Sequence, residues 1–327
     1  MTGFSDSFQR PINYLRISVT DRCNLRCIYC MPADGVSLVS HDDILSYEEI
    51  HTIIRAAAEL GINKIRVTGG EPLLRLGLSR LIEMLASMGL IDDISLTTNG
   101  ILLARFASEL KSAGLQRVNV SLDTLKPEKF EYITRGDKLN DVLEGIEAAK
   151  SVGLDPVKIN AVVMSGINDD ELLDYAAKTI SDGWHVRFIE LMPFAGESTG
   201  NLLFIPVSEI RQRLEVLGEL EPCLHSKGNG PAKYFRFAQA KGTIGFITPV
   251  SEHFCFQCNR LRLTADGKLR PCLLCEDEID LKEPLRGGIS SAGLKELIEK
   301  AAAMKPLRHH LAEGCVPKDR PFSQVGG

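Results

Sequence analysis

The sequence lacks several features that would assign it to a common class of protein. It has a single tryptophan in 327 residues, no apolar run long enough to cross a membrane, and no apolar core of signal-peptide length among its first residues. The cytoplasm is therefore the expected compartment. The formal net charge of −5 supplies no global basic field, so we expect neither nucleic acid nor a membrane as a partner. The sequence also has no P-loop, so any phosphate must be bound by individual basic side chains.

Cysteine is present but unevenly distributed. Thiols in the cytoplasm usually stay reduced, so clustered cysteines indicate metal or redox sites rather than disulfides. The nine cysteines comprise a first group at Cys23, Cys27 and Cys30, a second group at Cys255, Cys258, Cys272 and Cys275, and the isolated Cys223 and Cys315. Two groups more than two hundred residues apart predict two sites on one scaffold. We interpret the two isolated cysteines as thiols without a ligand role.

Strand-like and helix-like segments alternate along the first part of the chain. Between Ser46 and Gly61, for example, Ser46 is a plausible helix N-cap with Glu49 three residues on, and Gly61 is a stop signal. Strands are expected at 13–20, 64–72, 93–100, 117–123, 156–164 and 185–193. This alternation predicts an α/β fold with right-handed crossovers and a parallel sheet.

Six such units predict an incomplete parallel (β/α)6-type TIM barrel over residues 1–195. A closed barrel or a doubly wound open sheet remains an alternative. Residues 196–327 show a different pattern, with short strands around the second cysteine group. We expect this C-terminal region to close the barrel, to carry a second metal cluster and to supply substrate-binding arginines.

Polar residues lie at the carboxyl ends of the predicted strands, where an α/β barrel places its active site. They are Cys23–Cys30, Thr68–Glu71, Thr97–Asn99 and Ser121–Asp123, with Met192 at the end of the sixth strand. Their positions favour the barrel and predict that they meet in one site.

The first cysteine group has the spacing C-x3-C-x2-C. Soft thiolate ligands favour an iron–sulfur cluster, zinc or copper(I), and a structural zinc site would need a fourth ligand, for which His41 is the nearest candidate. Three thiolates on a four-iron cluster leave one iron open to a ligand. This motif, with Gly69-Gly70-Glu71-Pro72 after the second strand, resembles that of the radical S-adenosylmethionine superfamily.

The resemblance implies a [4Fe-4S] cluster on Cys23, Cys27 and Cys30 that binds S-adenosylmethionine and cleaves it to a 5′-deoxyadenosyl radical. It further implies that Gly70 contacts the amino-acid part of this molecule. Tyr29 would lie beside the adenine, and Ser121 and Met192 along the nucleoside. For Ser121 and Met192, ordinary filling of the barrel end is an alternative.

The second cysteine group has the spacing C-x2-C-x13-C-x2-C, which by itself is typical of a structural zinc ribbon. Arg260, Arg262, Lys268 and Arg270 lie within the same segment of an otherwise acidic chain. Guanidinium groups pair with phosphate oxygens in a bidentate manner, and Arg260 and Arg262 on a strand would share a face. The segment therefore indicates a phosphate-bearing substrate, with a solvated hairpin face as the alternative.

Taken together, the motifs resemble those of the GTP 3′,8-cyclase family of molybdenum cofactor biosynthesis. The shared segments are LRISVTDRCNLRCIYCMP, KIRVTGGEPLLR, LTTNG, SLDTL, CNRLRLTADGKLRPCLL and the final Gly326-Gly327. The resemblance implies a second [4Fe-4S] cluster on Cys255, Cys258 and Cys272, whose open iron contacts the purine. It implies that GTP is bound by Arg16, Arg66, Thr97, Lys158, Arg260 and Arg262, and that Arg16, Arg260 and Arg262 take part in catalysis with Cys23, Cys27 and Cys30.

The implied reaction begins with abstraction of the C3′ hydrogen of GTP, after which C3′ attacks C8 of guanine to give 3′,8-cyclo-7,8-dihydro-GTP. The implied partners are an external one-electron donor, a downstream cyclic pyranopterin monophosphate synthase and a second copy of the chain in a homodimer. The Gly-Gly end would enter the active site, although a frayed end is the ordinary expectation.

Two other interpretations stay open at this point. One is a different radical S-adenosylmethionine enzyme with an auxiliary cluster, such as a peptide-modifying one. The other is a non-catalytic zinc or electron-transfer protein. Cys275 is relevant to the zinc or electron-transfer interpretation. A fourth thiolate would occupy the open coordination position of the iron, or it would complete a four-cysteine zinc site. We expect Cys275 not to be a ligand.

Overall fold

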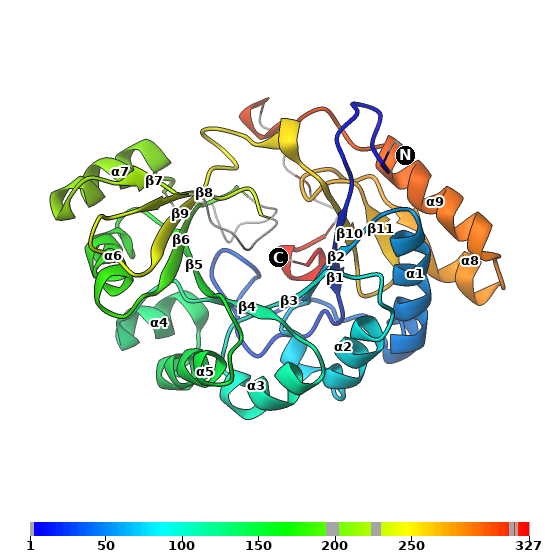
Figure 1. Ribbon diagram of the computed structural model, residues 1–327, viewed down its shortest axis with the longest axis horizontal. Helices are drawn as coiled ribbons and strands as arrows, with labels where there is room; N and C mark the ends of the chain where they lie inside the picture. Colours follow the sequence, from blue (N-terminus) through cyan, green and yellow to red (C-terminus); the bar gives the residue numbers. More distant parts are fainter. Residues whose placement is uncertain (1–2, 194–202, 224–229, 314–316, 318–319, 327) are drawn as a thin grey trace.

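The computed structural model describes residues 3–193, 203–223, 230–313, 317 and 320–326. Its main feature is one curved sheet with helices along its outer side (Figure 1). The strand order is β12-β11-β10-β1-β2-β3-β4-β5-β6-β9-β8-β7. The strands from β10 through β1–β6 to β9 pair in parallel, and antiparallel strands extend the sheet at both edges. The fold is thus α/β with a mostly parallel sheet, in the form of a partial barrel.

The first six strands and the helices that follow them form the barrel proper. The strands are β1 (Tyr14–Ser18), β2 (Lys64–Thr68), β3 (Asp93–Thr98), β4 (Arg117–Ser121), β5 (Val157–Val163) and β6 (His185–Glu190). The helices are α1 (Tyr47–Glu59), α2 (Leu78–Ala86), α3 (Leu103–Ser112), α4 (Pro127–Thr134), α5 (Leu139–Ser151) and α6 (Leu172–Ser181).

The C-terminal elements complete the same sheet. They are α7 (Val207–Leu214), β7 (Glu221–Pro222), β8 (Lys233–Arg236), β9 (Thr243–Ile247), β10 (Arg260–Leu263), β11 (Lys268–Arg270), β12 (Ile279–Asp280), α8 (Lys282–Arg286) and α9 (Ser291–Ala303). No helix in the described part of the chain is long and apolar enough to span a membrane.

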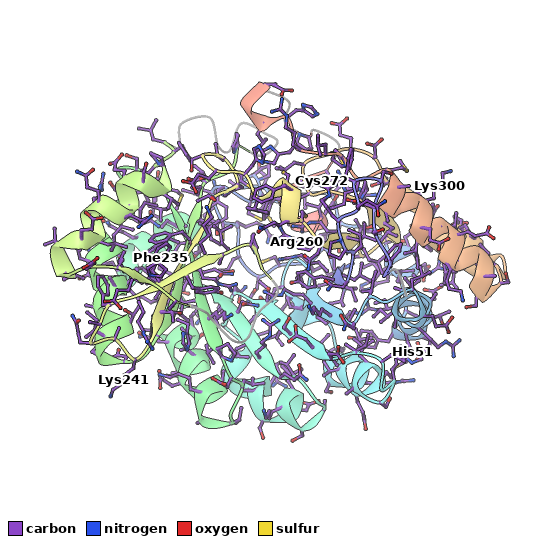
Figure 2. All side chains as sticks on the ribbon, turned by 45° about the horizontal axis from the view of Figure 1, so that its top comes forward. His51, Phe235, Lys241, Arg260, Cys272 and Lys300 are labelled. Atoms are coloured by element: carbon purple, nitrogen blue, oxygen red, sulfur yellow. The ribbon has the colours of Figure 1, made fainter. Side chains whose placement is uncertain are left out.

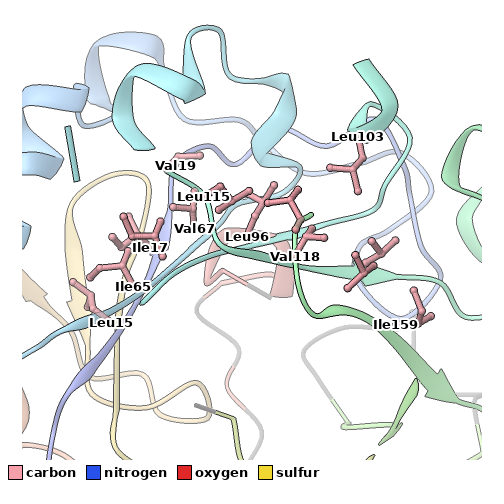
Figure 3. Packing of buried hydrophobic residues seen from close by; sticks show 14 of the residues in the cluster. Leu15, Ile17, Val19, Ile65, Val67, Leu96, Leu103, Leu115, Val118 and Ile159 are labelled. Carbon is pink, nitrogen blue, oxygen red and sulfur yellow. The ribbon is translucent and has the colours of Figure 1, made fainter. Parts of the chain in front are cut away.

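Side chains along β1 alternate between the hydrophobic core on one face of the sheet and the candidate site on the other. Leu15 and Ile17 are fully buried and pack with Val67 and Leu96 between the sheet and its helices (Figure 3). Because successive side chains on a strand point to opposite faces, Arg16 points to the concave side. The apolar residues that fix the strand therefore also fix which polar residues face inward.

The predicted elements are largely confirmed. All six expected strands are present, and α1 begins with the full capping box of Ser46 and Glu49 and is followed by Gly61 at φ +112°. The pattern analysis missed α4 and the C-terminal elements β7, β11, β12, α8 and α9. The predicted boundary between 195 and 196 lies outside the described residues, as does Cys315.

Candidate active site

A cavity of about 310 Å³ lies on the concave side of the sheet, and both cysteine groups line it. Figure 2 shows Arg260 and Cys272 near one another in the middle of this side. The predicted site residues that line the cavity are Arg16, Cys23, Cys27, Tyr29, Cys30, Arg66, Gly70, Thr97, Ser121, Met192, Cys255, Cys258, Arg260, Arg262 and Cys272. Chain segments more than two hundred residues apart thus meet at one site.

The first cysteine loop is held against the end of α4. The backbone amides of Arg26 and Ile28 donate to the carbonyls of Thr134 and Ile133, both at 2.9 Å. The Arg135 guanidinium donates to the carbonyls of Arg26 at 2.7 Å and Met31 at 3.3 Å, on either side of Cys27 and Cys30. These contacts hold a segment that has little regular structure of its own.

Gly69 and Gly70 are required by the close approach of the cysteine loop. A Cβ atom on Gly69 would lie 2.7 Å from the Thr20 carbonyl oxygen, and one on Gly70 would lie 2.4 Å from that of Arg22. The Gly70 amide donates to the Thr20 carbonyl at 2.8 Å. The two glycines therefore pack the loop onto the end of β2, a reason that the motif alone does not reveal.

Two buried carboxyl groups stand beside the first cysteine group. Glu71 accepts hydrogen bonds from Thr98 Oγ1 and the Asn99 amide, both at 2.7 Å, and burial raises its pKa to about 7. Asp123 accepts from the Tyr29 hydroxyl at 2.7 Å and from the Val162 amide at 2.8 Å, and burial raises its pKa to about 6. Tyr29 is thus held in a fixed position at the cavity wall.

These surroundings keep the first group of thiols protonated when no metal is bound. Burial raises the pKa of Cys23, and that of Cys27 well above its ordinary value. Burial, together with Cys23 and Asp123, raises the pKa of Cys30 to about 12.

The second cysteine group lies where β10 and β11 form an antiparallel hairpin. Cys255 begins a short 3₁₀ helix, Cys255–Gln257, and the Arg10 guanidinium donates to its carbonyl at 2.7 Å. Lys305, whose side chain is buried, donates to the carbonyls of Arg260 at 2.8 Å and Pro271 at 2.7 Å. Cations from both ends of the sequence therefore brace the second group, and the sequence analysis identified neither.

The second group of thiols has a different electrostatic environment. Although burial opposes it, Arg260 and Lys305 lower the pKa of Cys258 to about 7. A hydrogen bond from the Cys275 thiol lowers the pKa of Cys272, whereas burial raises that of Cys255. Cys275 also contacts the Cys272 carbonyl at 3.8 Å, but it is not among the residues that line the cavity.

Three arginines form a row across neighbouring strands of the sheet. Arg16 on β1 is in register with Arg66 on β2 and with Arg262 on β10. All three line the cavity, and burial lowers the pKa of each, to about 10 for Arg66 and Arg262. Like charges in neighbouring strand positions repel one another, so this row favours an anionic ligand.

Several buried polar atoms at the cavity lack a hydrogen-bond partner among the described residues. They are Arg66 Nε, Thr97 Oγ1, Asn160 Oδ1 and Arg187 Nε, and all four residues line the cavity. Such atoms are rarely left unsatisfied, so a polar ligand is expected to meet them. Arg187 and Asn160 were missed by the sequence analysis. Both occupy inward positions on their strands, and the alternating pattern of β5 and β6 could have identified them.

Lys158 is not among the residues that line the cavity, although it lies on the same face of β5 as Asn160, which does line it. Its side chain is buried, and Nζ lies 3.2 Å from the Tyr234 hydroxyl and faces that ring. Burial, together with Arg187, Arg117 and Arg66, lowers the pKa of Lys158 to about 6. Lys158 can thus influence a ligand through its charge, whereas Arg187 faces the cavity directly.

Residues 320–326 enter the concave side of the sheet (Figure 1). The Gly326 carbonyl accepts from Arg16 Nη2 and Arg262 Nη1, both at 3.0 Å. Gly326 has φ +74°, and a Cβ atom there would lie 2.8 Å from Thr68 Oγ1. Only glycine fits this position, and the expectation of a frayed end is wrong up to Gly326. Gly327 lies outside the described residues.

The donor set fits iron–sulfur clusters better than single ions. The cysteines that the structure describes are all free thiols. Within the described ranges, no three His, Cys, Asp or Glu side chains converge closely enough to hold a single metal ion. Cys23, Cys27 and Cys30 line the cavity together, and soft thiolates are the ligands that iron–sulfur clusters take.

The chain matches two family models. The Radical SAM superfamily model covers residues 17–178, and the Molybdenum Cofactor Synthesis C model covers residues 184–311. Among solved structures, that of Streptococcus suis SuiB bound to S-adenosylmethionine is similar, with a TM-score of 0.62 at 13% identity. The match covers 87% of this chain and 68% of SuiB, and it supports the fold.

Relatives align over nearly the whole chain. The GTP 3′,8-cyclase of Moorella thermoacetica is 52% identical over 98% of this chain and 99% of its own length. That of Pelotomaculum thermopropionicum is 53% identical with the same coverage. Identity at this level and over this length shows the family. The chain therefore belongs to the GTP 3′,8-cyclase family of radical S-adenosylmethionine enzymes.

Proposed function

We propose that this protein converts GTP to (8S)-3′,8-cyclo-7,8-dihydroguanosine 5′-triphosphate, the first step of molybdenum cofactor biosynthesis. The observation that carries this proposal is the row of Arg66, Arg16 and Arg262 on the wall of a cavity that both cysteine groups line. A buried cationic row suits a triphosphate, because several guanidinium forks can pair with its oxygens. The full-length similarity to GTP 3′,8-cyclases supports the same substrate.

Cys23, Cys27 and Cys30 would hold the cluster that binds S-adenosylmethionine. When bound, the two together supply a 5′-deoxyadenosyl radical. The chain itself orients the ligand: Asp123 holds Tyr29 at the wall, and Gly70, Ser121 and Met192 line the same part of the cavity.

Cys255, Cys258 and Cys272 would hold a second [4Fe-4S] cluster with one iron open to the purine. Supporting this assignment, all three line the cavity, whereas Cys275 does not. Arg260 lies beside Cys258, so the triphosphate and purine ends of GTP would be bound by adjoining parts of the β10–β11 hairpin. Arg16, Arg66, Thr97, Arg260 and Arg262 would contact GTP directly, and Lys158, which does not line the cavity, would act through its charge.

The remaining parts of the proposal follow from the family. They are an external one-electron donor, a downstream cyclic pyranopterin monophosphate synthase, a homodimer, the cytoplasm as the compartment, and a division into a barrel at 1–195 and a cluster-bearing region at 196–327.

The experiment is anaerobic reconstitution with iron and sulfide, followed by reaction with S-adenosylmethionine, a strong reductant and GTP deuterated at C3′. We expect the cyclised triphosphate and deuterium in 5′-deoxyadenosine. ATP serves as the nucleotide control. Cleavage of S-adenosylmethionine without deuterium transfer from GTP would contradict the proposed substrate. It would favour a radical enzyme that acts on another molecule.

A further inference from the structure

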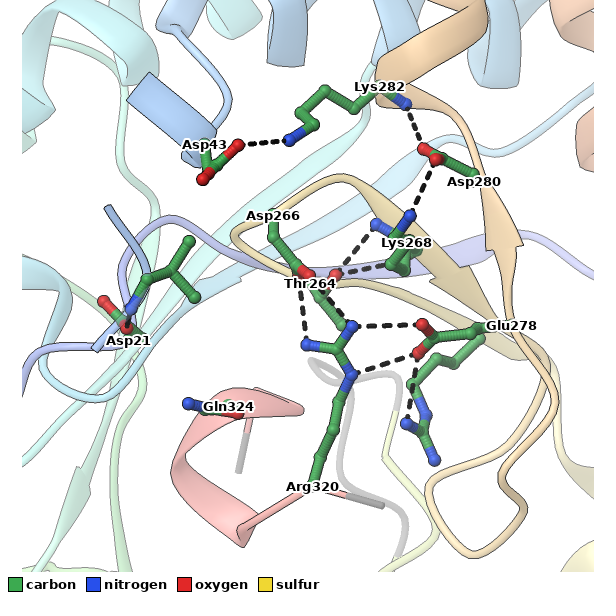
Figure 4. A network of polar contacts seen from close by, with 12 residues as sticks. Asp21, Asp43, Thr264, Asp266, Lys268, Glu278, Asp280, Lys282, Arg320 and Gln324 are labelled. Carbon is green, nitrogen blue, oxygen red and sulfur yellow. Dashed lines mark hydrogen bonds and ion pairs between the residues drawn. The ribbon is translucent and has the colours of Figure 1, made fainter. Parts of the chain in front are cut away.

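Arg320 fixes the start of the 320–326 segment to two carboxylates. Its Nη1 and Nη2 donate to Asp266 at 3.2 and 2.8 Å, and its Nη2 and Nε donate to Glu278 at 3.0 and 3.1 Å (Figure 4). The Arg320 side chain is only 15% exposed. Paired bidentate contacts of this kind fix both the position and the orientation of the guanidinium.

Both carboxylates belong to the region that carries the second cysteine group. Asp266 lies in the turn between β10 and β11, and Glu278 immediately precedes β12. Glu278 also pairs with Arg270 at 3.4 Å, and the fully buried Arg270 donates to the Cys275 carbonyl. One carboxylate therefore connects the 320–326 segment with the loop that follows Cys272.

The far end of the segment meets the substrate arginines. Arg16 is half-buried and its neighbour Arg262 is buried. Desolvation and then repulsion by Arg262 lower the pKa of Arg16. The Gly326 carbonyl accepts hydrogen bonds from both side chains and so holds them together. Between the two ends, Gln324 Nε2 donates to the Ser37 carbonyl at 3.0 Å, in the loop that follows the first cysteine group.

We propose that Arg320, through its pairing with Asp266 and Glu278, is a positioning residue that places the Gly326 carbonyl between Arg16 and Arg262 and so pre-organises them for the triphosphate. This inference rests on the proposed function and extends it to a residue outside the cavity. Arg320 is not among the residues that line the cavity. Its effect is therefore transmitted along the six residues that follow it.

The test compares Arg320→Gln with Arg320→Lys, and uses Arg213→Gln as the matched control. Arg213 also bridges two carboxylates, Asp169 and Glu209, but it does so away from the cavity. Hydrogen–deuterium exchange of residues 321–326 is measured on the reconstituted enzyme without substrate. We expect exchange about tenfold faster in Arg320→Gln, partial protection in Arg320→Lys and no change in Arg213→Gln.

The second measurement is binding of GTP and of S-adenosylmethionine to the same variants. We expect GTP to bind about fivefold to tenfold more weakly to Arg320→Gln, because pre-organisation is lost, and S-adenosylmethionine binding to stay unchanged. If Arg320→Gln folds poorly, Asp266→Asn removes one partner and should give a smaller effect in the same direction.

The two possible failures can be told apart. Unchanged exchange of residues 321–326 in Arg320→Gln overturns the inference, whatever the substrate. Equal weakening of both ligands overturns it as well, because that result indicates a general structural role. If the exchange increases as expected but the wild-type enzyme does not bind GTP, the anchoring role stands and the proposed substrate is wrong.

Discussion

The two cysteine groups line one cavity, yet their surroundings differ in the sign of the nearby charge. The first group lies beside the carboxyl groups of Asp123 and Glu71, and its thiols have raised pKa values. The second lies beside Arg260 and Lys305, and the pKa of Cys258 is lowered to about 7. The contrast arises because Glu71 and Asp123 follow β2 and β4, whereas Arg260 begins β10 and Lys305 follows α9.

This difference indicates which ligand belongs at which end of the cavity. S-adenosylmethionine carries a sulfonium and an ammonium group, and nearby carboxylates stabilise such cations. GTP carries a triphosphate, which the arginine row and the cations near the second group stabilise. We therefore expect S-adenosylmethionine to bind nearer the first cysteine group and the triphosphate of GTP to bind at the arginine row.

The largest effects should come from removing a ligand of either group. We expect Cys27→Ser to abolish cleavage of S-adenosylmethionine, because a serine oxygen is a poor ligand for a soft iron site. Cys258→Ser should retain reductant-driven formation of 5′-deoxyadenosine but lose cyclisation of GTP. Reconstituted wild type should contain about eight iron and eight sulfide per chain, and each variant about four.

Cys223→Ser is the control, since Cys223 lies away from the cavity, and it should behave as wild type. Formation of 5′-deoxyadenosine by Cys27→Ser would contradict the assignment of S-adenosylmethionine cleavage to the first cysteine group. Wild type with four iron and one zinc would refute the second cluster.

Loss of a single arginine near the second group should have the next largest effect. Arg260→Ala or Arg262→Ala should weaken GTP binding by about 1.5–3 kcal/mol for each charged hydrogen bond removed. Binding of S-adenosylmethionine should change little, because it offers no triphosphate. Equilibrium binding of both ligands to the reconstituted enzyme checks this, with Arg213→Gln as the control. An equal loss of affinity for GTP and for S-adenosylmethionine would mean that these arginines do not bind the triphosphate specifically.

The sequence predicted the strands and the cysteine loops because these features depend on local patterns. The six barrel strands follow from apolar runs at regular intervals, and the cysteine spacing is contained within eight residues. What it could not predict depends on register and long-range contact. The alignment of Arg66, Arg16 and Arg262 in one row requires the pairing of β2, β1 and β10, which come from distant parts of the chain.

Buried cations were missed for the same reason. Arg10, Lys305 and Arg320 lie in segments without a motif, and only the fold brings them to the second cysteine group or to its hairpin. Lys158 was placed correctly on a strand, but its contact with Tyr234, which the sequence analysis did not consider, depends on the fold.

The opposite pKa shifts of Cys258 and Cys30 should be visible in protein freed of its clusters. At pH 8, Cys258, with a pKa of about 7, is mostly thiolate, whereas Cys30, with a pKa of about 12, is protonated. Iodoacetamide alkylation is carried out at a series of pH values from 6 to 10, and mass spectrometry then measures the modification of each cysteine. Cys258 should become modified at a lower pH than Cys30. Similar pH profiles for the two cysteines would show that their surroundings do not differ in this way.

A smaller effect is expected from Lys158 when GTP binds. With a pKa of about 6, Lys158 is mostly neutral at pH 7.5 in the free protein. A bound triphosphate favours the charged form and raises this pKa, so binding should take up as much as about one proton per site. Calorimetry in two buffers with different ionisation enthalpies measures this uptake.

Lys158→Met serves as the control for this measurement and should remove the uptake. The uptake should also decrease as the pH falls to 6, where Lys158 is already partly charged. Proton release by wild type, or the same uptake by Lys158→Met, would show that this lysine does not respond to the ligand.

The smallest effect should come from replacing Cys275. If this thiol were a ligand, the second metal site would have no open coordination position. We expect Cys275→Ser to retain both clusters and substantial cyclisation of GTP. Cys275 contacts Cys272, close enough to reach the same metal, but it does not line the cavity and its carbonyl is held by the buried Arg270. An iron that binds the purine needs a free coordination position, and a fourth thiolate would occupy it. The test purifies Cys275→Ser and wild type anaerobically and compares their metal content and their yield of cyclised product. Loss of the second cluster from Cys275→Ser would identify Cys275 as a ligand, and the second site would then have to serve the protein without direct contact to GTP.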